Sequence, residues 1–137
     1  MMINDIVVNI LNKKSEPIKI EMIGDLADEF RAGRNPSELL ELLESDDENI
    51  LNIALYILGE INIASISILK EIVKKLEILS VHKESQIRYK TLINLASLSH
   101  KVNTDKLNNI YKKMSQDSNE SISKTAKELL RNGNLRF

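Results

Sequence analysis

The sequence predicts an all-α fold, specifically a right-handed solenoid of about four helical hairpins with roughly eight helices. Apolar residues recur at helical spacing through most of the chain, and one such pattern returns at nearly constant intervals. Only four glycines and two prolines occur, which is too few for the many tight turns of a sheet protein. Because 137 residues is about the length of one domain, we expect a single domain over residues 1–137.

The repeated pattern consists of apolar or small residues spaced by four positions, as on one face of a helix. Its four copies begin at isoleucines that are 32, 37 and 35 residues apart, close to the period of paired-helix repeats. The copies are Ile18, Met22 and Leu26; Ile50, Ala54 and Leu58; Ile87, Thr91 and Leu95; and Ile122, Ala126 and Leu130. Each copy predicts the second helix of a hairpin, with its apolar face packed against neighbouring hairpins.

Small residues follow the last leucine of three copies, at Ala27, Gly59 and Ala96, and we expect them to let neighbouring helices approach closely. Arg131 takes this place in the last copy, and a polar stretch at residues 132–134 follows it. The C-terminal hairpin is therefore predicted to be an end unit whose outer face meets water.

Each predicted second helix follows a polar cluster whose side chains suit a helix start. Ser, Asp and Asn accept hydrogen bonds from the free amides of a first turn, and acidic residues there match the helix dipole. The clusters lie at residues 15–17, 45–48, 82–85 and 117–120, and the first includes Pro17, which suits a first turn.

Upstream of each cluster, an amphipathic segment predicts the first helix of the hairpin. These segments are Ile3 to Asn12, Pro36 to Leu43, Ile66 to Leu79 and Asp105 to Met114.

The third copy has the most distinctive sequence. Residues 84–95 contain the apolar Ile87, followed directly by Arg88 and then by the small Thr91. This segment resembles the second helix of a HEAT repeat, and the resemblance extends over nearly the whole chain. Leu51 and Ser123 stand where the family places the arginine, so we expect the family's ladder of charged contacts between repeats to be incomplete. The resemblance implies a curved stack of helices with an extended binding surface.

Motifs that carry chemistry are scarce. The chain has no cysteine, its glycines are isolated, and its two histidines, His82 and His100, lie at predicted helix ends, where capping or solvation is the simplest role. No histidine or carboxylate spacing fits a metal site. We therefore expect no enzyme activity, cofactor, metal or small-molecule substrate. Polar residues interrupt the apolar stretch at residues 50–72, so we expect no membrane span and a cytoplasmic location.

Charge is distributed unevenly along the chain. Residues 21–60 hold eleven acidic residues against two arginines, whereas residues 70–137 hold fourteen basic residues against seven acidic ones. Such asymmetry bears on association with partners and not on the fold. Within the acidic part, we define an acidic segment that runs from residue 38 to residue 48. Its members are Glu38, Glu41, Glu44, Asp46, Asp47 and Glu48, which form either a binding site or a solvated helix face with helix caps.

These features favour a protein-binding module. Solenoids bind through extended surfaces, and tyrosine is enriched in binding hot spots. The expected contact residues are the acidic segment together with polar and aromatic residues of the second helices. The latter are Asn52, Tyr56, Arg88, Tyr89 and Asn94.

The chain's size, lack of cysteine and HEAT-like pattern resemble those of small bacterial immunity proteins that neutralise a co-encoded toxin. The resemblance implies that the acidic segment binds a basic toxin, such as a nuclease whose phosphate ligand it imitates. One alternative is nucleic-acid binding by the basic C-terminal half, although its lysines are mixed with acids and lack interleaved aromatic residues. Its candidate residues are Lys101, Lys106, Lys112, Lys113, Lys124 and Lys127. A generic scaffold and a lyase-type HEAT enzyme are the remaining alternatives.

Overall fold

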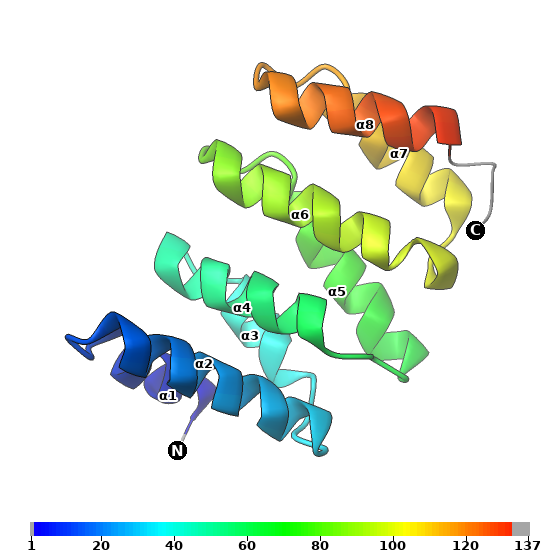
Figure 1. The fold of residues 1–137 in the computed structure, drawn as a ribbon. Coiled ribbons are helices and arrows are strands. Elements are labelled where there is room, and N and C mark those ends of the chain that lie inside the picture. Colours follow the sequence, from blue (N-terminus) through cyan, green and yellow to red (C-terminus); the bar gives the residue numbers. More distant parts are fainter. Residues whose placement is uncertain (1, 133–137) are drawn as a thin grey trace. The chain divides into compact units, whose positions relative to one another are not determined.

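The computed structural model describes residues 2–132, and within that range it contains eight α-helices and no strand. This confirms the predicted all-α class, and each of the four predicted first helices occurs within two residues of its expected limits. The helices are α1 (Ile3–Leu11), α2 (Glu16–Arg31), α3 (Glu38–Leu43), α4 (Glu48–Glu60), α5 (Ile66–Leu79), α6 (Ser85–Ser97), α7 (Thr104–Met114) and α8 (Glu120–Asn132), with a short 3-10 helix, η1 (Ser99–Lys101), after α6 (Figure 1).

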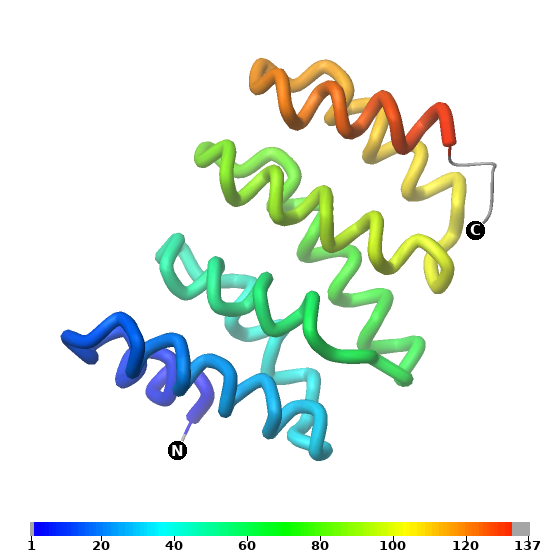
Figure 2. The backbone as a smooth tube through the Cα atoms, viewed as in Figure 1, coloured from blue at the N-terminus to red at the C-terminus, as the bar shows by residue number. Residues whose placement is uncertain are grey.

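The chain divides into two compact units, one up to Lys75 and one from Leu76 onward, so the boundary falls within α5. In the N-terminal unit, α1 packs against α2, α3 and α4, while α2 and α3 both pack against α4. The tube trace of Figure 2 shows α2 and α4 side by side in this unit. In the C-terminal unit, α8 packs against both α6 and α7. Each unit therefore places second helices of the predicted hairpins next to each other.

The core of the N-terminal unit is built from aliphatic side chains at helical spacing. Helix α1 buries Ile3, Val7 and Ile10 on one face, and the central helix α4 buries residues on several faces because three helices cover it. Full burial of one such side chain stabilises the fold by roughly 1.5–3 kcal/mol. The other core residues here are Leu26, Ala27 and Phe30 of α2; Leu39, Leu42 and Leu43 of α3; and Ile50, Leu51, Ile53, Ala54, Leu55, Ile57 and Leu58 of α4.

The C-terminal unit has a core that includes the hydroxyl of Thr91. Thr91 lies fully buried on α6, and its Oγ1 donates a hydrogen bond to the carbonyl oxygen of Ile87 at 2.8 Å. The hydroxyl is thereby satisfied without a partner from another helix, so Thr91 packs like a small apolar residue. The apolar core residues around it are Ile87, Leu92 and Leu95 of α6; Leu107, Ile110, Tyr111 and Met114 of α7; and Ile122 and Ala126 of α8.

The helix-start clusters act largely as predicted. Ser15 caps α2 through a hydrogen bond from the Ile18 amide, and Asp47 caps α4 by accepting from the amide of Asn49 at 2.8 Å. In α8 the Asn119 side chain accepts from the third amide of the helix. Helix α6 differs, because its N-cap residue makes no side-chain hydrogen bond. Instead the ring Nδ1 of His82 accepts from the amide of Glu84 at 3.0 Å, which bears out the capping role expected for this histidine.

Helix α2 ends in a Schellman turn that depends on Gly33. The amide of Arg34 donates to the carbonyl oxygen of Glu29, and the amide of Gly33 donates to that of Phe30. Gly33 has a φ of 118°, which a side chain with Cβ rarely adopts. This turn redirects the chain from α2 toward α3 and fixes where Arg34 lies.

The first repeat copy departs from the predicted packing. Ile18 is 49% exposed, whereas the matching Ile50, Ile87 and Ile122 are buried. Within the N-terminal unit, α4 is covered by both helices of the first hairpin, but α2 has a neighbouring hairpin on one side only. At the positions expected to carry small residues for close helix approach, Ala27 is buried, Ala96 is half-buried and Gly59 is exposed. Of the predicted polar C-terminal stretch, residues 133 and 134 lie outside the described residues.

Candidate protein-binding surface

Two outward positions recur on the second helices, and they define a candidate binding surface in the N-terminal unit. On α2 they are occupied by Ile20 and Gly24, and on α4 by Asn52 and Tyr56, each pair one helical turn apart. We call these four residues the α2–α4 face. Ile20 is 67% exposed and Tyr56 is 50% exposed, although both are large and apolar enough to favour burial. The face therefore offers apolar contact area to a partner.

Arg31 holds the two helices of this face together. Its Nε donates to the carbonyl oxygen of Glu60 at 3.1 Å, and its Nη2 pairs with the carboxylate of Glu60 at 3.0 Å. Arg31 also forms an ion pair with Asp28 one turn earlier on α2. Because Arg31 and Glu60 both end their helices, α2 and α4 run side by side in the same direction. The repeat pattern then aligns Gly24 with Tyr56.

Acidic side chains surround the α2–α4 face. Glu21 and Asp25 lie on α2, are exposed, and form no ion pair or side-chain hydrogen bond with any residue from 2 to 132. Asp28 and Glu60 share the single guanidinium of Arg31. The balance of these five charged groups is negative, so the face attracts basic groups.

The corresponding positions in the C-terminal unit are also partly apolar. On α6 they are Tyr89, which is 38% exposed, and Ile93, which is 44% exposed; on α8 they are the charged Lys124 and Glu128. Tyr56 and Tyr89 thus both lie at the surface, as the sequence led us to expect, and Asn52 is half-buried. Asn94 differs, since it is only 7% exposed and donates a hydrogen bond to the Lys90 carbonyl oxygen at 3.0 Å. It is unavailable as a contact residue.

Most of the acidic segment is engaged within the chain. Glu38 receives two hydrogen bonds from Arg34, at 3.0 and 3.2 Å, and Arg34 also pairs with Glu29 and lies over the ring of Phe30. These contacts, chiefly the hydrogen bonds with Glu38, raise the pKa of Arg34. They tie the end of α2 to the start of α3, so Glu38 has a structural partner.

The remaining acids of the segment fall into two groups. Glu44 forms an ion pair with Lys75, Glu41 accepts a hydrogen bond from Asn4 at 3.2 Å, and Asp47 is the N-cap of α4. Asp46 is exposed and Glu48 half-buried, and neither carboxylate has an ion-pair partner among residues 2–132. The structure thus leaves Asp46 and Glu48, with the exposed Glu41, as the acids of this segment best placed to meet a partner.

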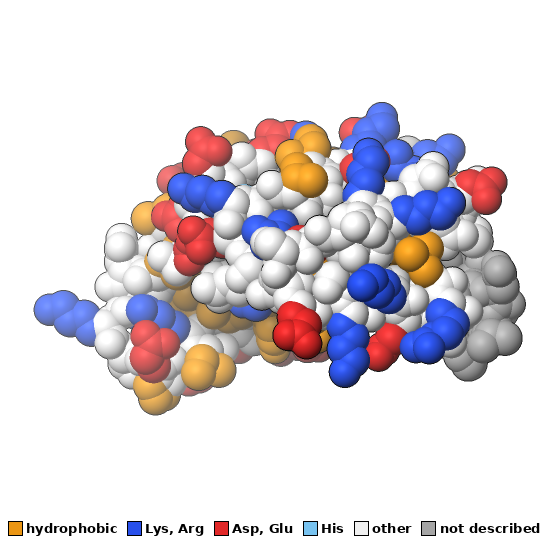
Figure 3. Space-filling model, turned by 90° about the horizontal axis from the view of Figure 1, so that it is seen from above, with side chains coloured by type: hydrophobic (Ala, Val, Ile, Leu, Met, Phe, Trp, Pro, Cys, Tyr) orange, Lys and Arg blue, Asp and Glu red, His pale blue; other side chains and the backbone are white. Residues whose placement is uncertain are grey.

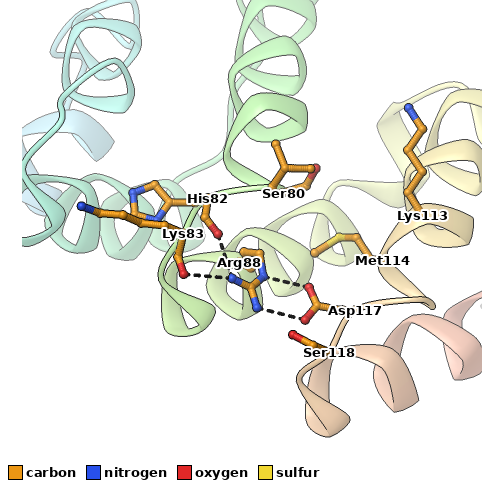
Figure 4. Close-up of a pocket in the computed structure, with 9 residues that line it drawn as sticks. Ser80, His82, Lys83, Arg88, Lys113, Met114, Asp117 and Ser118 are labelled. Atoms are coloured by element: carbon orange, nitrogen blue, oxygen red, sulfur yellow. Dashed lines mark hydrogen bonds and ion pairs between the residues drawn. The ribbon is translucent and has the colours of Figure 1, made fainter.

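Arg88 is largely enclosed by its own unit, as Figure 4 shows. Its Nε and Nη2 donate to the two carboxylate oxygens of Asp117 at 2.8 and 3.0 Å, and its Nη1 donates to the carbonyl oxygens of His82 and Lys83 at 2.8 and 3.2 Å. The Arg88 side chain is only 14% exposed. The hydrogen bonds from Arg88, helped by the amide of Asn119, hold the pKa of Asp117 below its ordinary value. This arginine joins the α5–α6 turn to the α7–α8 turn, and little of it can reach a partner.

A cleft of about 310 Å³ lies beside this ion pair. Ser80, Met114 and Ser118 contribute to its walls together with the Arg88–Asp117 pair. In Figure 4 the ammonium group of Lys83 points away from Arg88, and Lys113 stands at the opposite side. The only carboxylate among its lining residues is already bound to Arg88, so the cleft shows no arrangement of acid, base and nucleophile.

Sequence reasoning missed three features of these surfaces. Ile20 and Ile93 are exposed, and Gly24 lies between Ile20 and the α2–α4 contact region. The repeat alignment could have indicated that Ile20 and Ile93 are exposed. Ile20 aligns with Asn52 and Ile93 aligns with Tyr56, and Asn52 and Tyr56 were expected to face outward. Asp117 was read only as part of a helix-start cluster, although it also binds Arg88.

Several kinds of site are absent from the described part of the chain. Among residues 2–132, no group of three or more His, Asp or Glu side chains is placed to hold a metal ion. Over the same residues, no helix combines the length and apolar character needed to cross a membrane. Figure 3 shows Lys and Arg side chains spread across the visible face with acidic side chains between them.

A comparison with models of known protein families and a comparison with curated proteins each found no match.

Proposed function

We propose that this chain is a non-catalytic protein-binding module whose N-terminal unit binds a basic protein. The observation that carries the proposal is the α2–α4 face, where the exposed Ile20 and Tyr56 lie among acidic side chains. Exposed apolar and aromatic side chains supply contact energy, and surrounding acids supply attraction and selectivity for basic partners. The unpaired Asp46 and Glu48 at the start of α4 extend the negative charge of the same unit.

A HEAT-like solenoid is the architecture we propose for this module. Two observations support it within the units. Second helices of successive hairpins pack side by side, α2 with α4 and α6 with α8. The Arg88–Asp117 ion pair joins residues 29 positions apart, which places one charged contact between the third and fourth hairpins. At Leu51, which is fully buried, no such contact can form. A charged contact at the arginine position of the third copy, with none at Leu51 of the second, fits the incomplete ladder expected from the sequence.

The most specific form of the proposal is an immunity protein that neutralises a cognate toxin with a basic surface, such as a nuclease. A nuclease must bind polyphosphate, so its active-site cleft is basic, and a protein with a dense acidic surface can occupy that cleft. The acidic residues 21–60 of this chain supply that charge, and the exposed Tyr56 supplies an anchor. Cytoplasmic location and the absence of cofactors belong to this proposal.

The experiment that tests the proposed function is capture of partners by the tagged chain from its native cells, followed by mass spectrometry. The expected result is one stoichiometric basic protein that is toxic when expressed alone and is tolerated by cells that co-express this chain. A variant with Glu41, Asp46 and Glu48 all changed to Lys is the test of charge. These three acids are chosen because reversing Asp47 or Glu44 would also remove a helix cap or an ion pair. Retention of the partner by this variant and by Tyr56→Ala would contradict binding through the N-terminal unit.

Nucleic-acid binding is the second candidate function, and exposed lysines on the packed helices α7 and α8 favour it. Lys112, Lys113, Lys124 and Lys127 are all exposed, and no ion pair involves them among residues 2–132. Phosphate contacts made by lysines weaken steeply with salt. Titrating a labelled DNA duplex with the chain at two salt concentrations, and measuring the affinity at each, therefore distinguishes nucleic-acid binding from protein binding. Tight, salt-sensitive binding that is lost in Lys112→Glu with Lys124→Glu would replace the protein-binding proposal.

A further inference from the structure

Gly24 occupies an outward position in the middle of α2 for which the protein's own packing gives no reason. The matching residues of the other second helices are Tyr56, Ile93 and Glu128, all of which are exposed. A Cβ built on Gly24 would meet no atom within 4 Å, and Gly24 has helical backbone geometry without a positive φ. An interior glycine weakens a helix relative to alanine because it loses more backbone freedom on folding. Neither packing nor backbone geometry within the unit therefore requires glycine here.

The surroundings of Gly24 are those of a contact surface. Ile20, one turn earlier, and Tyr56, at the aligned position of α4, are both at least half exposed. Glycine at this position adds no side chain over the helix backbone, and a partner chain can approach backbone most closely at such a position. We call this open position, which shares the α2–α4 face with the exposed Ile20 and Tyr56, the notch.

Charge selects the occupant of this notch. Glu21 and Asp25 flank Gly24 on α2, and both are exposed without an ion pair among residues 2–132. Lysine or arginine side chains can satisfy these carboxylates, while an acidic segment would be repelled. An apolar side chain of the same segment can pack between Ile20 and Tyr56.

We propose that the notch at Gly24 is the docking point for an extended or helical segment of the partner protein that carries basic residues around one apolar anchor. This inference rests on the proposed function, because it specifies where the basic partner binds. It predicts that bulk at position 24 blocks binding without unfolding the chain. Gly24→Trp places a bulky side chain in the notch, and because its Cβ lies in open space we expect the variant to fold.

The control adds the same side chain to the same unit outside the face. Asn9 is exposed on α1 and contributes to no described ion pair or side-chain hydrogen bond, so Asn9→Trp introduces the same side chain into the same unit at a position outside the α2–α4 face. Circular dichroism and urea unfolding of both variants verify that each is folded before binding is measured.

The probe is a displayed library of random peptides selected against the full chain. We expect the recovered peptides to be rich in Lys and Arg with an apolar residue among them. Their affinity should fall at least about tenfold in Gly24→Trp and stay within about twofold in Asn9→Trp. Gly24→Trp should likewise release the basic protein captured from native cells, whereas Asn9→Trp should retain it.

The possible failures are distinguishable. If basic peptides bind both variants equally, the docking point is elsewhere on the acidic unit, and the notch proposal is wrong while the proposed function stands. If selection recovers no basic peptides and native cells yield no basic partner, both proposals fail. Sedimentation tests a second copy of the chain as the occupant. Self-association that Gly24→Trp abolishes would overturn the assignment to a separate basic partner.

Discussion

The guanidinium of Arg88 and the carboxylate of Asp117 face each other through two parallel hydrogen bonds, at 2.8 and 3.0 Å, across 29 residues of sequence. Their side chains are only 14% and 9% exposed. A bidentate pair with this little exposure is stronger than an ordinary surface salt bridge, because water screens it less. Arg88 also holds two carbonyl oxygens of the α5–α6 turn. The pair is therefore a structural joint of the C-terminal unit.

Removing Arg88 is expected to destabilise the protein without weakening partner binding. Arg88→Ala leaves Asp117 nearly buried and without its main partner, and we expect the free energy of unfolding to fall by about 2–3 kcal/mol. Urea unfolding measures this loss, and the peptides selected for the N-terminal unit report binding. The exposed Lys124→Ala on the same unit is the control and should change stability by less than about 0.5 kcal/mol. Lost binding by folded Arg88→Ala would mean that Arg88 does contact the partner.

The Arg88–Asp117 pair also predicts how the free energy of unfolding depends on pH. The pKa of Asp117 is held below its ordinary value in the folded protein, mainly by the hydrogen bonds from Arg88. A carboxyl with a lowered folded pKa contributes stability that is fully present above its unfolded pKa of about 3.9. That contribution disappears as the pH falls below this value and through the folded pKa. We therefore expect the wild type to lose more unfolding free energy than Asp117→Asn between about pH 5 and pH 2. Equal losses, measured by urea unfolding across this range, would rule out a contribution from Asp117.

Local signals explain why the helices could be predicted from the sequence. Ser15 and Asp47 mark helix starts by accepting hydrogen bonds from amides that are two or three residues away, and such contacts depend little on the rest of the fold. Pro17 suits a first turn because that turn does not need its missing N–H. The buried stripe of α5 through α8 likewise follows helical spacing. Three-four spacing of Leu107, Ile110 and Met114 is enough to place them on one face.

Contacts between distant residues explain what the sequence did not disclose. Ile18 has the same spacing as Ile50, yet only Ile50 is covered, because burial depends on a neighbouring hairpin and not on the stripe itself. The acidic segment was interpreted as a uniform block, but Arg34, in the turn before α3, neutralises Glu38, and Lys75 of α5 neutralises Glu44 across a long stretch of sequence. Sequence spacing cannot indicate which acid meets which base across such separations.

Adjacent acids at the start of α4 should respond differently to removal. Asp47 accepts hydrogen bonds from the amides of Asn49 and Ile50, at 2.8 and 3.4 Å, whereas Asp46 is exposed and has no such bond. Asp47→Ala is expected to lower the free energy of unfolding by about 1 kcal/mol through loss of the cap. Asp46→Ala should stay within about 0.5 kcal/mol of the wild type. The urea midpoints of the two variants measure these changes in stability. If Asp46 contacts the partner, Asp46→Ala should weaken binding more than Asp47→Ala does. Equal destabilisation by the two changes would contradict the capping role.

Alanine at Gly24 and alanine at Gly33 should shift the free energy of unfolding in opposite directions. Gly24 lies within α2 with open space where a Cβ would be, so Gly24→Ala gains helix propensity without a clash. We expect the free energy of unfolding to rise by about 0.8–1 kcal/mol. Gly33 also has open space, but its φ of 118° is unfavourable for alanine, and Gly33→Ala should cost about 1–2 kcal/mol. Thermal and urea unfolding of both variants measure the difference. A loss of stability in Gly24→Ala would show that the fold itself requires glycine there, which would remove the reason to assign the notch to a partner.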